Sequence, residues 1–84
     1  MTGTAGARKS QLLRKSGYAY NFNRMVYFNR QAKKAFSVEF VEDHSASYLQ
    51  RYIKKTEREP GWHFYFNGRD LPTAVRRELE GALG

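Results

Sequence analysis

Trp62-His63-Phe64-Tyr65-Phe66 is the stretch that decides how this chain folds. Aromatic rings recur at every second position, and successive side chains of a β-strand point to opposite faces of a sheet. Trp62, Phe64 and Phe66 therefore share one face, while His63 and Tyr65 share the other. We predict a strand over these residues, with its first face packed against helices.

A helix is predicted immediately before this strand. Asp43-His44-Ser45 offers helix-capping side chains, and Pro60-Gly61 offers a stop. Four apolar residues between them fall on one helical face: Tyr48, Leu49, Tyr52 and Ile53. The spacing predicts a helix from Ser45 to about Glu57.

A second helix is predicted after the strand. Asn67-Gly68 favours a turn, and Asp70, with Pro72 just inside the first turn, favours a helix start. Its apolar face would hold Val75, Leu79, Ala82 and Leu83.

The N-terminal half contains three more runs of alternating character, at residues 18–22, 25–29 and 35–42. In the last run Phe36, Val38 and Phe40 share one face. A short polar loop separates the second and third runs, which predicts an antiparallel hairpin. Before them, residues 8–16 favour a short helix that Gly17 ends.

These elements predict an α+β protein. Its three- or four-stranded antiparallel sheet would carry two amphipathic helices packed on one face, in the order (short α)-β-(β)-β-α-β-α. Residues 1–16 are expected to form a basic, partly flexible N-terminal segment, and residues 17–84 a single compact domain.

Composition excludes several classes of protein. With 40 % hydrophobic residues and 13 aromatic residues among 84, the chain is too apolar to be disordered. Cysteine is absent, which excludes disulfides and thiolate chemistry. No apolar run approaches a membrane span, so we expect a cytoplasmic protein. Neither a paired-histidine spacing nor a glycine-rich phosphate loop is present, so no metal or cofactor is expected.

Charge is unevenly distributed along the chain. Residues 1–38 carry eight basic residues and no acid, whereas residues 39–84 carry seven bases and eight acids. A strongly basic segment suits a polyanion, and we predict a non-enzymatic, dimeric protein that binds nucleic acid, DNA or RNA. The expected phosphate contacts are Arg8, Lys9, Arg14, Lys15, Arg24, Arg30, Lys33 and Lys34.

The sheet face away from the helices is expected to be rich in tyrosine. Its predicted members are Tyr18, Tyr20, Tyr27, Tyr65 and His63. Such a face could stack unpaired bases. It could equally form a dimer interface, or a second, thin core under the N-terminal segment, because a tyrosine ring packs while its hydroxyl stays wet.

Two other functions stay open. One is a small interaction module, for example from a mobile element, that self-associates through its aromatic face as a homo-oligomer, with a dimer favoured. The other is an RNase-type toxin, for which His63, Tyr65, Arg69 and Arg30 form the suspected set.

Overall fold

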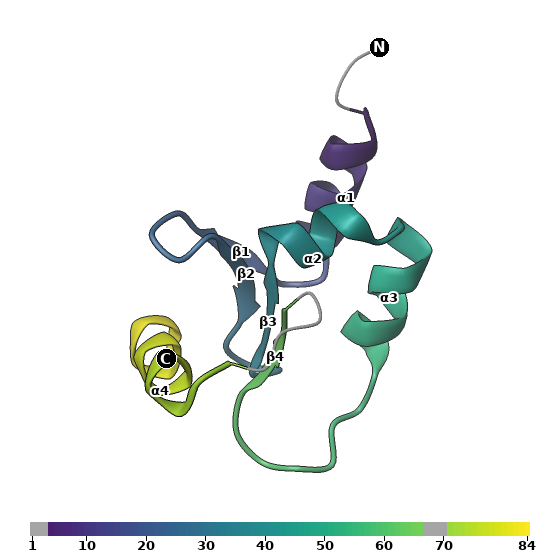
Figure 1. The fold of residues 1–84 in the computed structure, drawn as a ribbon. Helices are drawn as coiled ribbons and strands as arrows, with labels where there is room; N and C mark the ends of the chain where they lie inside the picture. The colour runs from purple at the N-terminus through teal and green to yellow at the C-terminus, as the bar shows by residue number, and fades with distance from the viewer. Residues whose placement is uncertain (1–3, 67–70) are drawn as a thin grey trace.

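The structure, a computed structural model, describes residues 4–66 and 71–84. It consists of a small sheet with helices on both sides (Figure 1). The elements are α1 (Thr4–Lys15), β1 (Ala19–Asn21), β2 (Val26–Asn29), β3 (Lys34–Ser37), α2 (Val38–Asp43), α3 (Ala46–Lys54), β4 (His63–Tyr65) and α4 (Thr73–Leu83). None of these helices is long and apolar enough to cross a membrane.

The sheet has four strands in the order β1-β2-β3-β4, which confirms the α+β class. The first three form an antiparallel meander, and the expected hairpin of β2 and β3 is present. β4 differs from expectation because it runs parallel to β3. A parallel neighbour needs a crossover, and residues 38–62 supply one that contains α2 and α3 (Figure 1).

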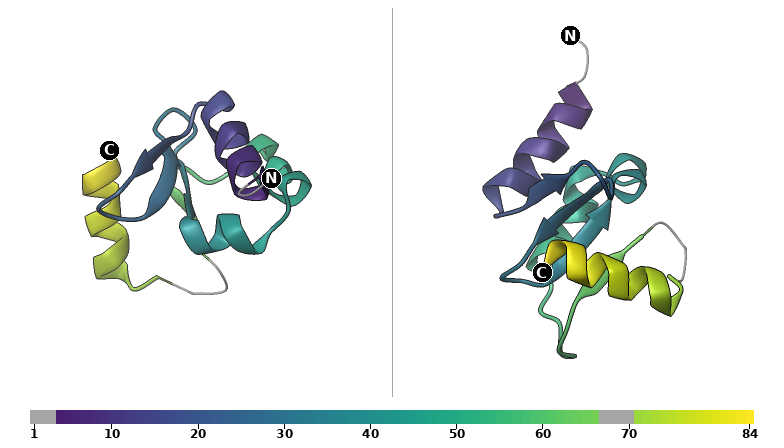
Figure 2. Two further views of the ribbon diagram at one scale, coloured as in Figure 1. Left: turned by 90° about the horizontal axis from the view of Figure 1, so that it is seen from above. Right: turned by 90° about the vertical axis from the view of Figure 1, so that its left-hand side faces the viewer.

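Helices cover both faces of the sheet rather than one. In the β3–β4 register Phe36 lies opposite Tyr65, and Ala35 lies opposite Phe64. Phe36 therefore shares a face with Tyr65, not with Phe64 as the separate strand patterns suggested. Both faces are apolar as a result, and both need a cover. Helices α1, α2 and α3 lie on one side of the sheet and α4 lies on the other (Figure 2).

Two hydrophobic clusters result, one on each face. The larger cluster contains Leu13, Tyr18, Phe36, Phe40, Val41 and Leu49. The smaller one contains Val26, Ala35 and Leu83, with half-buried Phe28, Trp62, Phe64 and Phe66 packed against it.

The strand expected over residues 35–42 is wrong in its second half. β3 ends at Ser37, whose Oγ accepts a hydrogen bond from the backbone N–H of Phe40 at 3.1 Å. This serine cap opens helix α2, which buries Phe40 and Val41 in the larger cluster. The alternation of Phe36, Val38 and Phe40 is therefore shared between a strand and a helix.

Gly17 ends α1, as the sequence predicts. Its φ of 92° lies in the left-handed region, and its N–H donates to the carbonyl of Arg14 at 3.1 Å. The next N–H, from Tyr18, donates to the carbonyl of Leu13 at 2.9 Å. This pair of bonds is the Schellman motif, and its usual apolar contact is present because Leu13 and Tyr18 belong to the same cluster.

The two remaining helices are shorter than predicted. Ser45 caps α3 as expected, with its Oγ accepting from the N–H of Tyr48, but the helix ends at Lys54 rather than near Glu57. α4 begins at Thr73, so Pro72 lies just before the helix and not inside its first turn. Leu79 and Leu83 form its buried face, whereas Val75 is 42 % exposed and Ala82 is also exposed. The predicted turn at Asn67-Gly68 and the start at Asp70 lie outside the described residues.

Candidate functional site

Helix α1 presents most of its charge away from the sheet. Leu13 is fully buried, and at helical spacing Arg8 and Lys15 lie roughly opposite it. Arg8, Arg14 and Lys15 are exposed. Lys9 is half-buried and donates from Nζ to the carbonyl of Glu42 at 3.1 Å, which ties α1 to the end of α2.

Helix α3 continues this charge. It contacts α1 and lies beside it on the same side of the sheet (Figures 1 and 2). Leu49 is buried in the same cluster as Leu13. Arg51 and Lys54 lie on the opposite side of α3 from Leu49, so they point away from the cluster, as the bases of α1 do. We call this set the helical basic surface; it consists of Arg8, Arg14, Lys15, Arg51 and Lys54, all exposed.

Lys34, an expected phosphate contact, is instead buried at 4 % exposure. Its Nζ donates to the carbonyls of Tyr52 at 2.7 Å and Ile53 at 3.2 Å, and also to that of Lys55. These are carbonyls left open where α3 ends. Burial lowers the pKa of Lys34, while the nearby Glu57 carboxylate opposes that shift. Lys34 is therefore not a phosphate contact, because its ammonium binds the carbonyls at the end of α3 and is not available to a ligand.

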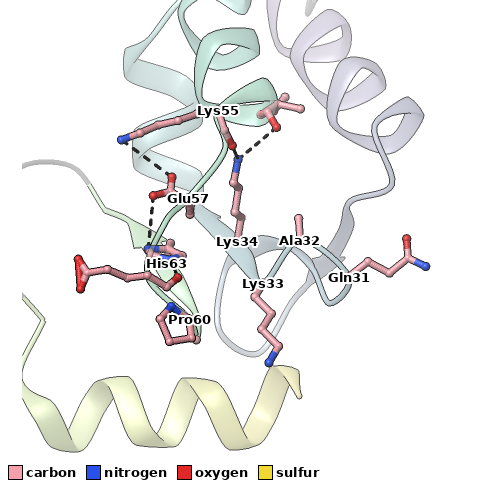
Figure 3. A pocket seen from close by; sticks show the side chains of 11 residues that line it. Gln31, Ala32, Lys33, Lys34, Lys55, Glu57, Pro60 and His63 are labelled. Atoms are coloured by element: carbon pink, nitrogen blue, oxygen red, sulfur yellow. Dashed lines mark hydrogen bonds and ion pairs between the residues drawn. The ribbon is translucent and has the colours of Figure 1, made fainter.

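Two other predicted bases are also engaged within the protein. Arg30 donates from Nε to the carbonyl of Leu83 at 2.6 Å, at the end of α4, and its guanidinium lies over the ring of Phe28. Arg24 forms an ion pair with Glu78 at 2.7 Å. Lys33 remains exposed, with a left-handed φ of 55°, and points away from Lys34 (Figure 3).

The tyrosines do share one sheet face, but helices cover most of it. Tyr18 is buried, Tyr27 packs against the larger cluster, and the ring of Tyr65 stacks on Phe36 at 5.1 Å. The hydroxyl of Tyr18 has no hydrogen-bond partner among the residues described, and burial raises the pKa of Tyr18 to about 12. Of the alternatives that the sequence left open, a core under the N-terminal segment is the one observed at Tyr18.

Tyr20 lies at the edge of this covered face. Its ring contacts Tyr27 at 4.8 Å and, edge-on, Phe22 at 4.8 Å. Phe22 and Met25 project from the β1–β2 turn, at 84 % and 59 % exposure. We call these two residues the hairpin tip; together with the half-buried Tyr20 beside it, it is an exposed part of the aromatic face.

A second cluster of polar side chains forms around Glu57, in the segment between α3 and β4. Its carboxylate accepts a hydrogen bond from the hydroxyl of Tyr65 and lies 3.6 Å from Nδ1 of His63. The ammonium of Lys55 lies 3.9 Å from the same carboxylate (Figure 3). On its other side, His63 places Nε2 2.9 Å from the carbonyl oxygen of Glu59.

The electrostatics of this cluster keep Glu57 ionised. The hydrogen bond from Tyr65, together with the charges of His63, Lys55 and Lys34, lowers the pKa of Glu57. Burial and the bond to Glu57 raise the pKa of Tyr65. The side chains of Glu57 and His63 are 16 % and 21 % exposed, so a ligand can still reach both.

The cluster lines an open hollow of about 410 Å³ between the β2–β3 turn and the segment after α3. Lys33, Lys55, Glu57 and His63 contribute to its walls (Figure 3). Of the suspected RNase set, the structure brings His63 and Tyr65 together, while Arg30 is engaged at the end of α4 and Arg69 lies outside the described residues.

Glu57 was not identified as a site residue from the sequence, where it marked only the expected end of a helix. Its signal would have been the early end of α3, which turns this side chain toward β4. Within residues 4–66 and 71–84, no three His, Asp or Glu side chains come together where they could hold a metal ion.

The chain matches no protein-family model, no curated protein and no solved structure.

Proposed function

We propose that this protein binds nucleic acid through the helical basic surface. The carrying observation is that two helices far apart in the sequence lie side by side and turn five exposed bases away from one shared core. Lysine and arginine spaced by helical turns suit a repeating phosphate backbone. A nucleic-acid partner also implies a compartment that contains it, and we propose the cytoplasm.

The hairpin tip adds a second mode of contact. The ring of Phe22 packs against that of Tyr20, and Tyr20 packs against Tyr27. These contacts orient the exposed ring of Phe22. An aromatic face of this kind can stack an unpaired base, worth roughly 1–3 kcal/mol per base. We therefore expect single strands to bind more tightly than duplexes of the same length.

Fluorescence anisotropy with labelled single-stranded and duplex DNA and RNA across a salt series tests the proposal. About five phosphate contacts predict a log–log slope of roughly −3 to −5. Lys15→Glu and Lys54→Glu should each weaken binding, and each should reduce the slope by about 1. Arg77→Glu is the matched control, because Arg77 is exposed on α4, on the opposite side of the sheet. Equal effects of Lys54→Glu and Arg77→Glu would refute the helical basic surface.

Self-association is the second candidate, and the exposure of Phe22 and Met25 favours it. Two exposed apolar side chains in one turn offer a surface that a second copy of the chain could cover. A dimer built on the hairpin tip predicts concentration-dependent sedimentation that Phe22→Ser abolishes. A monomeric wild-type chain at all concentrations would exclude it.

A further inference from the structure

The cluster around Glu57 holds an acid and a base side by side. The carbonyl oxygen of Glu59 can only accept a hydrogen bond, so His63 carries a proton on Nε2. Its Nδ1 faces the Glu57 carboxylate at 3.6 Å. The imidazolium form, with a proton on each nitrogen, is complementary to both neighbours. In that form His63 can donate a proton beside a carboxylate that can accept one.

The contact is suited to reaction as well as to stability. At 3.6 Å, Nδ1 and the carboxylate oxygen are too far apart for a strong hydrogen bond, so the Nδ1 proton is available to an incoming oxygen. Lys55, with a side chain 54 % exposed, stands on the other side of the carboxylate, where positive charge would meet a phosphate. Tyr65 fixes the carboxylate from behind through its hydroxyl. Lys55, Glu57 and His63 all line the open hollow, through which the backbone of a nucleic acid can approach them.

We propose that this hollow cleaves RNA by internal transesterification, an inference that rests on the proposed binding of nucleic acid. Glu57 accepts the proton of a ribose 2′-hydroxyl, and the 2′ oxygen forms a bond to the adjacent phosphorus. The bond from phosphorus to the 5′ oxygen breaks, and His63 gives its Nδ1 proton to that oxygen. The products are a 2′,3′-cyclic phosphate and a 5′-hydroxyl. Lys55 stabilises the charge that develops on the phosphate oxygens.

The same geometry resets the pair without another reactant. After cleavage Glu57 is protonated, and His63 is neutral with its remaining proton on Nε2, held by the Glu59 carbonyl. Nδ1 then presents its lone pair to the Glu57 carboxyl group, and the proton returns directly from oxygen to nitrogen. The carbonyl of Glu59 thus fixes which nitrogen takes part, which makes Glu59 a positioning residue through its backbone.

Comparing RNA with DNA distinguishes binding at the helical basic surface from cleavage in the hollow. Both carry the phosphates that the helical basic surface contacts, but DNA lacks the 2′-hydroxyl that the reaction consumes. A single-stranded DNA is therefore expected to bind and remain intact, and to inhibit cleavage of RNA by competition.

The test uses the full chain with a 5′-labelled RNA and the DNA of the same sequence, and it measures anisotropy and cleavage in parallel. Wild-type protein should cut only the RNA and leave a 2′,3′-cyclic phosphate. Glu57→Gln and His63→Gln should each lower the rate about 100-fold or more while RNA binding stays within about twofold. Glu39→Gln, an exposed carboxylate on α2, is the matched control and should cleave at the wild-type rate. Circular dichroism checks the folding of each variant.

The outcomes are distinguishable. RNA binding without cleavage, or cleavage that survives in both Glu57→Gln and His63→Gln, overturns the reaction and leaves the proposed function standing. If one of the two variants does not fold, the other decides the question. Absence of RNA and DNA binding by the folded wild-type chain refutes the proposed function itself.

Discussion

The two faces of the sheet are built very differently. On one face three helices enclose a cluster in which Leu13, Phe36 and Leu49 have no exposed surface. On the other, α4 alone covers a row of rings that all remain half-buried (Figure 2). This first face, which we call the sealed face, also holds the basic helices and Tyr65. We infer that the sealed face provides most of the folding stability and positions the basic helices and Tyr65, whereas packing of α4 on the other face contributes less.

The largest effect is expected from Phe36→Ala. Phe36 is fully buried and its ring contacts Tyr18, Phe40 and Tyr65, so its removal opens a cavity lined by α2, β4 and the segment before β1. We expect a loss of about 3–5 kcal/mol in the free energy of unfolding. Urea denaturation followed by circular dichroism measures this loss. A loss below about 1 kcal/mol would show that the sealed face does not provide most of the stability.

Leu83→Ala probes the α4 face at its most buried point. Leu83 has no exposed surface, but the rings around it are half-buried and can move to fill part of the space. We expect a loss of about 2–3 kcal/mol, at the low end of leucine-to-alanine substitutions in cores. The same denaturation experiment applies, and a loss larger than that of Phe36→Ala would reverse the assignment of the two faces.

Lys34→Met sharpens the comparison at the edge of the sealed face. Methionine retains most of the buried chain but leaves the carbonyls of Tyr52, Ile53 and Lys55 without their donor. We expect a loss of about 1–3 kcal/mol. Lys33→Met is the matched control, because Lys33 is exposed and points away from Lys34, and it should change stability by no more than about 0.5 kcal/mol. Equal losses would show that Lys34 does not close α3.

Tyr18→Phe is expected to have the smallest effect near neutral pH and a clear one in alkali. Its hydroxyl is buried with no partner in the part of the chain that the structure describes, so removing it should be neutral or slightly stabilising at pH 7.

In alkali the sign follows from the raised pKa. The folded pKa of Tyr18, about 12, lies above the value of about 10 for an unfolded tyrosine, so the unfolded chain releases its proton first. The stability that the wild type has below pH 10 is lost as the pH rises toward 12. Tyr18→Phe should flatten this loss in urea titrations from pH 9 to 12. An unchanged slope would place the alkaline sensitivity elsewhere, with Tyr65 the next residue to test.

Local signals in the sequence predicted the elements whose boundaries are set locally. Ser45 and Gly17 act on their own neighbours, and both behave as expected. The face of Phe36 was not predictable, because alternation within each strand does not say which faces align until the strands pair. Ser37 offered a cap that the alternating pattern concealed.

The site divides in the same way. Arg51 and Lys54 were not among the predicted phosphate contacts; helical spacing shows the side they occupy once Leu49 is known to be buried. The roles of Lys34 and Arg30 could not be predicted, because each completes a helix end that is distant in the sequence. Glu57 depends on the same closure, since α3 ends where Lys34 meets it.

The parallel pairing of β3 and β4 has a consequence for how the chain folds. β1, β2 and β3 are neighbours in sequence, and their meander can form as soon as they are made. β4 must wait until residues 38–62 have closed the crossover, and closing such a segment costs entropy before any pairing repays it. We therefore expect amide protection to appear first in the meander and last in β4. His63 and Tyr65 would then reach Glu57 only in the final step, when the last strand adds to the sheet.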